Sequence, residues 1–249
     1  MTTTTDVQKK LDDKTPEKAD KIRSLLEAHQ KQFELALAGT IQSDKFVRVA
    51  LTEVRRNPKL GEASVPSLLG ALLASAQLGL EPGGPLGHAY LVPYGKEVQL
   101  IVSYKGMEQL AYRSGIVASI NARVVREGDV FDFEFGSNEY VRHIPKAGVG
   151  GEVTHAYCIA RLVTGGQVMV VLFREDIERR KGRSKATGKE SPWSTDYDEM
   201  ARKSAIRAIF RDLPASTETQ RALGYDERQF TSPADADLDV DVIDVEEVE

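Results

Sequence analysis

The glycine- and lysine-containing segment at residues 182–190 is a first candidate for chemistry, because such a segment can cradle the phosphates of a nucleotide. A Walker A loop has four residues between its two glycines and a serine or threonine after the lysine, which holds Mg²⁺. Here five residues separate Gly182 from Gly188, and Glu190 follows Lys189. The segment therefore does not predict nucleotide hydrolysis, and we expect no cofactor.

Three acidic residues and a histidine could bind a metal ion for nuclease chemistry: Asp129, Asp132, Glu134 and His143. Asp129 follows Gly128 in an expected turn, and alternating acids are equally typical of a solvent-facing strand. The other histidines are not spaced as two ligands on one helix. We expect no metal site and no catalytic residues, and a metal-dependent nuclease remains the alternative to a binding protein.

Basic residues recur at spacings that gather them on helix faces. Two such rows are Lys105, Gln109 and Arg113 in an expected helix at 104–114, and Lys203, Arg207 and Arg211 in an expected helix at 196–212. Between the rows lies a segment with six bases and no acid: Arg179, Arg180, Lys181, Arg183, Lys185 and Lys189. One row alone is typical of a solvated helix face. Two rows and a basic segment together indicate a surface for a polyanion.

Aromatic residues accompany these bases. Tyr90, Tyr94 and Tyr104 lie around an expected hairpin, and Trp193 follows the basic segment. Stacking of a nucleic-acid base on an aromatic ring contributes about 1–3 kcal/mol and tolerates any sequence. A basic surface with nearby rings therefore suits single-stranded nucleic acid, although strand tyrosines often serve only packing.

The net charge of −5 hides an uneven distribution. Residues 233–249 carry eight acids and no base. Without them, 33 Lys and Arg residues face 30 Asp and Glu residues, a net charge of +3. The acidic average therefore does not argue against a nucleic-acid partner.

Cys158 is the single cysteine, so no intrachain disulfide is possible, which fits a reducing compartment. The most apolar stretch, at 65–80, is interrupted by Pro66, Gly70 and Gln77. We therefore expect a cytoplasmic protein without a membrane partner.

The elements that must position these residues change along the chain. Helices are expected from 16 to about 33, from 43 to 56 and around 68–76; strands at 88–94, 97–102, 117–126, 152–163 and 167–173; and a polar loop at 182–191. Helices first and strands later predict an α+β fold with N-terminal helices and a central antiparallel sheet with packed helices.

We expect four segments. These are a disordered N-terminus at 1–15, a domain at 16–214 for DNA binding, annealing and oligomerisation, a C-terminal segment at 215–232, and a disordered acidic tail at 233–249.

Several motifs, in this order and spacing, resemble the RecT family of phage single-strand annealing proteins. They are Asn-Pro-Lys-Leu at 57–60, Leu-Gly-Leu-Glu-Pro at 78–82, Gly-His-Ala-Tyr-Leu-Val-Pro-Tyr at 87–94, Ser-Tyr-Lys-Gly at 103–106 with Arg-Ser-Gly at 113–115, Ser-Pro-Trp at 191–193 and Glu-Met-Ala-Arg-Lys-Ser at 199–204. Ser103 stands where the motif has glycine, and Ser204 where it has threonine.

The resemblance implies an annealer without nucleotide hydrolysis, with a core like that of other annealing proteins. It would form rings or helical filaments on DNA, bind single strands and keep the annealed duplex. The resemblance places Lys105, Arg113, Trp193, Arg202, Lys203 and Arg207 nearest the DNA. It also implies a phage exonuclease and the host single-strand-binding protein as partners. A nonspecific single-strand coat is a third possibility.

The acidic tail is either a solubilising end or a mimic of DNA that competes for the basic surface. If it competes, deleting residues 233–249 should tighten DNA binding at low salt, where screening is weakest. Titration of a labelled single strand with the full and shortened chains checks this, and equal affinities would leave only the solubilising role.

Overall fold

The computed structural model describes residues 21–148, 150–184, 188–189, 191–214 and 216–227. Within these ranges the helices are a helical stretch at 21–28, α2 (Gln30–Leu37), α3 (Ser43–Arg56), the 3₁₀ helix η1 (Pro58–Glu62), α4 (Val65–Gln77), α5 (Tyr104–Arg113), α6 (Arg174–Gly182), α7 (Pro192–Thr195), α8 (Tyr197–Ile209) and α9 (Thr217–Glu227). The strands are β1 (Ala89–Tyr94), β2 (Glu97–Val102), β3 (Val117–Arg126), β4 (Val130–Glu134), β5 (Tyr140–Ile144), β6 (Val153–Leu162) and β7 (Gln167–Phe173).

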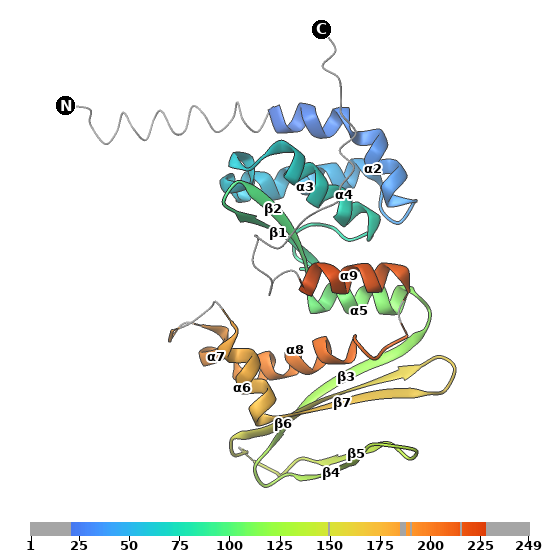
Figure 1. The fold of residues 1–249 in the computed structure, drawn as a ribbon, viewed down its shortest axis with the longest axis vertical. Coiled ribbons are helices and arrows are strands. Elements are labelled where there is room, and N and C mark those ends of the chain that lie inside the picture. The colour runs from blue at the N-terminus through green and yellow to red at the C-terminus, as the bar shows by residue number, and fades with distance from the viewer. Residues whose placement is uncertain (1–20, 149, 185–187, 190, 215, 228–249) are drawn as a thin grey trace, which may run out of the picture.

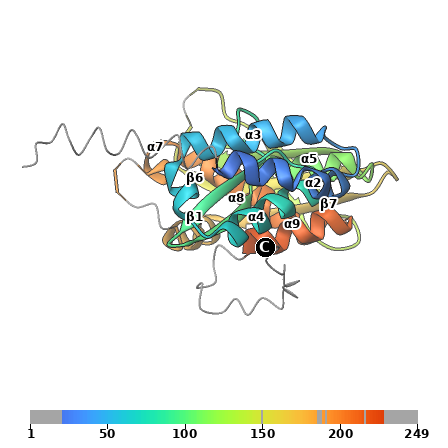
Figure 2. The same cartoon turned by 90° about the horizontal axis from the view of Figure 1, so that it is seen from above.

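The elements are stacked in layers, as Figure 1 shows. The N-terminal helices and the β1–β2 hairpin form one end, α5 and α9 follow, and α8 lies between them and a three-stranded sheet. The β4–β5 hairpin forms the other end. Viewed from above in Figure 2, helices α2 to α4 overlie α5 and α8, so the layers form one column. One buried apolar cluster runs through the N-terminal helices, α5, α8 and the sheet.

The sequence correctly predicts the α+β class, but the strands form three antiparallel sheets instead of one. These are β1–β2, the sheet β3-β6-β7, and β4–β5. The expected hairpin at 88–102 is β1–β2, where Gly95 at the turn has a φ of +62°.

Four local expectations were incomplete. The first expected helix is interrupted at His29, β4 and β5 pair as a hairpin, and α9 packs on α5 and β2 within the expected C-terminal segment. Residues 179–181 of the basic segment lie in the last turn of α6, and Gly182, where the polar loop was expected to begin, ends this helix. The expected start of the first helix, the disordered ends and Lys185 lie outside the described residues.

Helix α5 is fixed to the β1–β2 hairpin by the Ser-Tyr-Lys-Gly motif at 103–106. The hydroxyl of Ser103 accepts a hydrogen bond from the Gly106 amide at 3.1 Å and donates one to the Gly87 carbonyl at 2.6 Å. Ser103 therefore caps α5 and ties it to the chain before β1, a contact that glycine at this position could not make. A Cβ atom on Gly106 would lie 2.2 Å from the His88 carbonyl oxygen.

We predict that Gly106→Ala destabilises the protein by about 1–3 kcal/mol, because the added methyl group forces α5 away from His88. Gly70→Ala in α4 is the matched control, because no atom lies within 4 Å of its added Cβ. The control should stabilise by about 0.5–1 kcal/mol, since alanine favours a helix. Urea unfolding of both variants measures the difference, and equal effects would contradict the close approach.

Candidate nucleic-acid interface

Four cations from α6, α8 and the turn just after α8 gather on one side of α8: Arg180, Lys203, Arg207 and Arg211. Burial, and then the charge of Arg180, lower the pKa of Arg207 to about 10. Burial and Arg207 lower the pKa of Lys203, while burial and Arg211 lower that of Arg180. These four positive charges thus lie close together and are partly shielded from water. We call the four residues the α6–α8 cluster. An anion bound there would relieve both effects.

The packing of α6 and α8 on the sheet creates this cluster. Helix α6 begins directly after β7, where the Phe173 amide donates to the Asp176 carboxylate at 3.2 Å. Helix α8 crosses β3, β6 and β7, with Ala201 and Ala205 fully buried beneath it. Lys203 and Arg207, four residues apart, therefore lie on the flank that faces α6. Helix α8 ends at Ile209, about one turn before the end expected at 212, so Arg211 lies just beyond the helix.

The remaining bases of the predicted basic segment have different surroundings. Arg179 pairs with Asp176 at 3.1 Å, and Lys181 pairs with Glu178 at 3.4 Å, each within α6. Lys181 also lies over the ring of Tyr197, 5.5 Å from its centroid. Arg183 and Lys189 are exposed. These basic residues surround the cluster. Because Arg179 and Lys181 are each paired with an acid, they add less net positive charge to the surface than a count of basic residues in the sequence indicates.

Trp193 lies in the protein interior. Its side chain is 6% exposed and its ring meets Tyr197 edge-on, with centroids 6.0 Å apart. The Tyr197 hydroxyl donates to the Glu178 carboxylate at 2.8 Å, so the two rings join α7, α8 and α6. Base stacking needs an exposed ring, and we therefore assign Trp193 a packing role. The sequence alone did not reveal that this tryptophan faces inward.

The two α5 cations are separated from each other. The guanidinium of Arg113 donates to the carbonyl of Gly79 at 3.1 Å and also to that of Leu78, so it fixes α5 to the end of α4. Lys105 is exposed in the first turn of α5. Burial raises the pKa of nearby Glu108, and the charges of Arg202 and Lys105 oppose this rise. Lys105 and Arg202 therefore both lie within charge range of Glu108.

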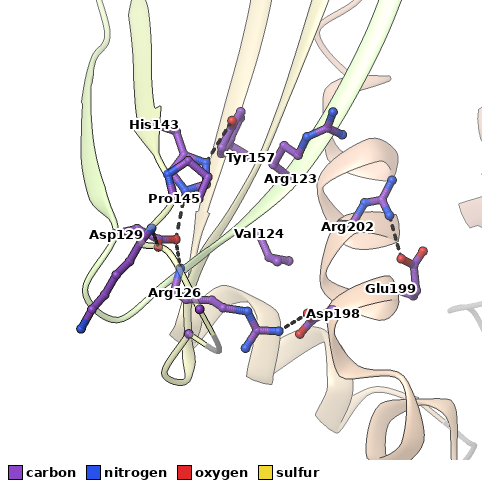
Figure 3. Close-up of a pocket in the computed structure, with 13 residues that line it drawn as sticks. Arg123, Val124, Arg126, Asp129, His143, Pro145, Tyr157, Asp198, Glu199 and Arg202 are labelled. Carbon is purple, nitrogen blue, oxygen red and sulfur yellow. Dashed lines mark hydrogen bonds and ion pairs between the residues drawn. The ribbon is translucent and has the colours of Figure 1, made fainter.

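Arg202 borders a groove over the edge of β3 with a volume of about 630 Å³ (Figure 3). Its Nη1 pairs with Glu199 at 2.7 Å, while its buried Nε has no hydrogen-bond partner. Arg123 and Arg126 of β3 also line the groove, and Arg126 pairs with Asp198 of α8. Neither of these β3 arginines was among the residues predicted to contact DNA. The alternation of polar Ser, Asn and Arg at 119, 121 and 123 could have indicated Arg123.

Asp129 anchors the β4–β5 hairpin beside this groove (Figure 3). Its carboxylate accepts from the amides of Lys146 and Arg126, both at 2.8 Å, and from His143 Nε2 at 3.0 Å. His143 Nδ1 in turn lies 3.3 Å from the Tyr157 hydroxyl. The backbone donors, from Lys146 first, and then His143 lower the pKa of Asp129 to about 2. This carboxylate therefore has a structural role.

The other acids of the nuclease alternative are not gathered around Asp129. Asp132 accepts a hydrogen bond from the Tyr140 hydroxyl, and Glu134 is exposed further along β4. Within the described part of the chain, no three His, Cys, Asp or Glu residues are arranged to hold a metal ion. No helix among the described residues is long and apolar enough to span a membrane. Burial raises the pKa of the Cys158 thiol to about 12, so this cysteine has little thiolate character.

Comparison with known proteins shows similarity over most of the chain. The sequence model of the RecT family matches residues 44–240. Protein RecT of Escherichia coli (strain K12) is 45% identical over 219 residues, which is 84% of this chain and 81% of that protein. The uncharacterized protein YqaK of Bacillus subtilis (strain 168) is 27% identical over 194 residues, covering 78% of this chain and 66% of that protein.

We predict that Asp129→Asn destabilises the protein by about 1–3 kcal/mol, because charge-assisted hydrogen bonds are lost. Since the pKa of Asp129 is lowered to about 2, its stabilising effect is present above the ordinary value of about 3.9 and is lost as pH falls toward 2. Urea unfolding between pH 7 and pH 2 measures both effects, with exposed Glu134→Gln as control. The difference between the variants should shrink toward pH 2; a constant difference would contradict the ionic role.

Proposed function

Because this chain belongs to the RecT family, we propose that it binds single-stranded DNA and anneals complementary strands in homologous recombination. Family membership supports the general role, and the α6–α8 cluster supports the mode of binding. The proposal includes a phage origin, cytoplasmic action and catalysis of pairing without nucleotide hydrolysis.

The α6–α8 cluster is the observation that carries the proposal. Burial first, and then a neighbouring positive charge, lower the pKa of each of Arg180, Lys203 and Arg207. A polyanion would therefore bind there more favourably than on an isolated lysine. Annealing requires that phosphates be neutralised while base edges stay free for pairing. A cluster of guanidinium and ammonium groups meets this requirement, because it binds the backbone and leaves sequence recognition to Watson–Crick pairing.

Strand annealing does not require an external energy source, because base pairing and stacking favour the duplex. The protein needs only to reduce phosphate repulsion and to bring two strands together. The segment 182–190 lacks the spacing of a phosphate-binding loop, which agrees with this mechanism.

Assembly on DNA is part of the proposal. One α6–α8 cluster can contact only a few phosphates, whereas stable pairing needs strands held over many nucleotides. A ring or helical filament of identical chains would repeat the cluster along a strand. We propose that the partners are single-stranded DNA, the annealed duplex and other copies of the chain, with a phage exonuclease and a host single-strand-binding protein in the same pathway.

Mixing labelled complementary oligonucleotides with the protein, without ATP, tests the function. Annealing should be faster than without protein, and the strands should stay intact. Shortened strands with Mg²⁺ would instead indicate the nuclease. Protection without faster pairing would indicate a nonspecific coat.

We predict that Lys203→Ala and Arg207→Ala each weaken single-strand binding and flatten the dependence of log K on log salt. The slope should change by about 0.7 for each lost phosphate contact. Binding titrations at several salt concentrations measure it, with Arg48→Ala as control, since Arg48 is exposed on α3 in the N-terminal layer. Slopes equal to that of the wild type would show that this flank of α8 does not contact DNA.

A further inference from the structure

The three-stranded sheet has a polar outer face on the side away from α8. In the β3–β6 register, Ser119 lies opposite Arg161, Asn121 opposite Ile159, and Arg123 opposite Tyr157. Side chains alternate along a strand, and the intervening residues Ala122, Ala156 and Cys158 are buried beneath α8. The first six residues therefore share the outer face.

The β4–β5 hairpin covers only part of this face. Phe131 of β4 stacks on Tyr157, with ring centroids 5.7 Å apart, and also meets His155 at 5.1 Å. Phe133 meets Phe173 at the end of β7 with centroids 6.1 Å apart. Met169 and Val171 of β7 are buried but do not belong to the main core cluster. These contacts cover β7 and one end of β6 and leave the β3 side open.

A groove in two adjoining parts lies along the open side. Its first part has a volume of about 410 Å³ and is lined by the six outer-face residues. Its second part is the groove of about 630 Å³ at the β3 edge, and Arg123 and Tyr157 line both parts. The second part extends over the β3 edge from Arg123 and Tyr157 to Arg202 on α8, as the side chains in Figure 3 show.

The groove has an excess of positive charge. Five bases line it, Arg123, Arg126, Lys146, Arg161 and Arg202, against three acids, Asp129, Asp198 and Glu199. Each acid is already engaged: Asp129 by the hairpin, Asp198 by Arg126 and Glu199 by Arg202. No carboxylate of the described residues forms an ion pair with the other three bases, Arg123, Arg161 and Lys146.

We propose that this groove, which we call the outer groove, binds a second single strand of DNA during annealing; the inference rests on the proposed function. The basic side chains that form no ion pair with a described carboxylate can bind phosphates. Ser119 and Asn121 supply further donors of the kind that contact phosphate and sugar. The groove is extended and open, as a flexible strand requires. A small ligand would instead favour an enclosed site with a few convergent polar groups.

Helix α8 relates the outer groove to the α6–α8 cluster. Arg202 points toward the groove, and the next residue, Lys203, lies about 100° further around the helix with the cluster. Two strands would thus lie on adjacent sides of one helix, which is about 10–12 Å wide with its side chains. Holding both strands at this separation raises the effective concentration of one for the other.

The double variant Arg123→Ala/Arg161→Ala tests the outer groove. Affinity for a first labelled oligonucleotide should stay within about twofold of the wild type, because the α6–α8 cluster is intact. Annealing of a complementary strand should slow at least about tenfold, and Arg123→Lys/Arg161→Lys should restore most of the rate. Arg23→Ala/Arg48→Ala, which removes two exposed arginines from the N-terminal layer, is the matched control and should anneal normally. An unchanged urea midpoint confirms that the double variant is folded.

Other outcomes would overturn the proposal in distinguishable ways. Wild-type annealing by Arg123→Ala/Arg161→Ala would exclude the second-strand site. If this variant also lost binding of a poly-aspartate peptide that the wild type binds, the groove would belong to an acidic protein segment. A loss of first-strand affinity as large as that of Lys203→Ala/Arg207→Ala would make the groove part of the first site. A wild type that neither binds nor anneals DNA would contradict the proposed function itself.

Discussion

Helix α8 lies on the three-stranded sheet through small side chains, and this contact sets the positions of the α6–α8 cluster and of the α8 side of the outer groove. Ala201, Ala205 and Ala208 are buried between the helix and the strands, so the helix axis lies close to the sheet. With this face fixed, helical geometry places Arg202 on the β3 side and Lys203 with Arg207 on the α6 side. A larger residue at Ala201 or Ala205 would lift the helix and disturb both flanks together.

The α6–α8 cluster shows how a fold can keep like charges together at a binding surface. Burial and mutual repulsion lower the pKa values of Lys203, Arg207 and Arg180, and both effects oppose folding. The core beneath α8 offsets this cost, and a bound phosphate backbone would reduce it. Binding of DNA and stability of this region are therefore expected to be coupled, since a ligand that binds only the folded state stabilises it.

The hairpin β4–β5 and the β1–β2 hairpin are attached by different means. The Asp129 carboxylate fixes the β4–β5 hairpin by accepting hydrogen bonds from two backbone amides and from His143. It therefore has a structural role beside the groove that we assign to a second strand. The second is held to α5 by Ser103 and by the close approach of Gly106 to His88. In both places, residues that resemble functional motifs in the sequence serve to fix a hairpin.

The sequence by itself determined the α+β class, most element positions, the RecT resemblance and the two rows on α5 and α8, because periodicity and motif spacing are local properties of the chain. It did not determine that Trp193 is buried against Tyr197, that Arg113 binds the end of α4, or that residues 179–181 end a helix beside α8. It did not reveal that Arg123 and Arg161, which are distant in sequence, line the same groove, because only the pairing of β3 with β6 places them on one sheet face. Only the tertiary structure decided which bases share a surface, because that depends on which helix flank and which sheet face are already covered by packing.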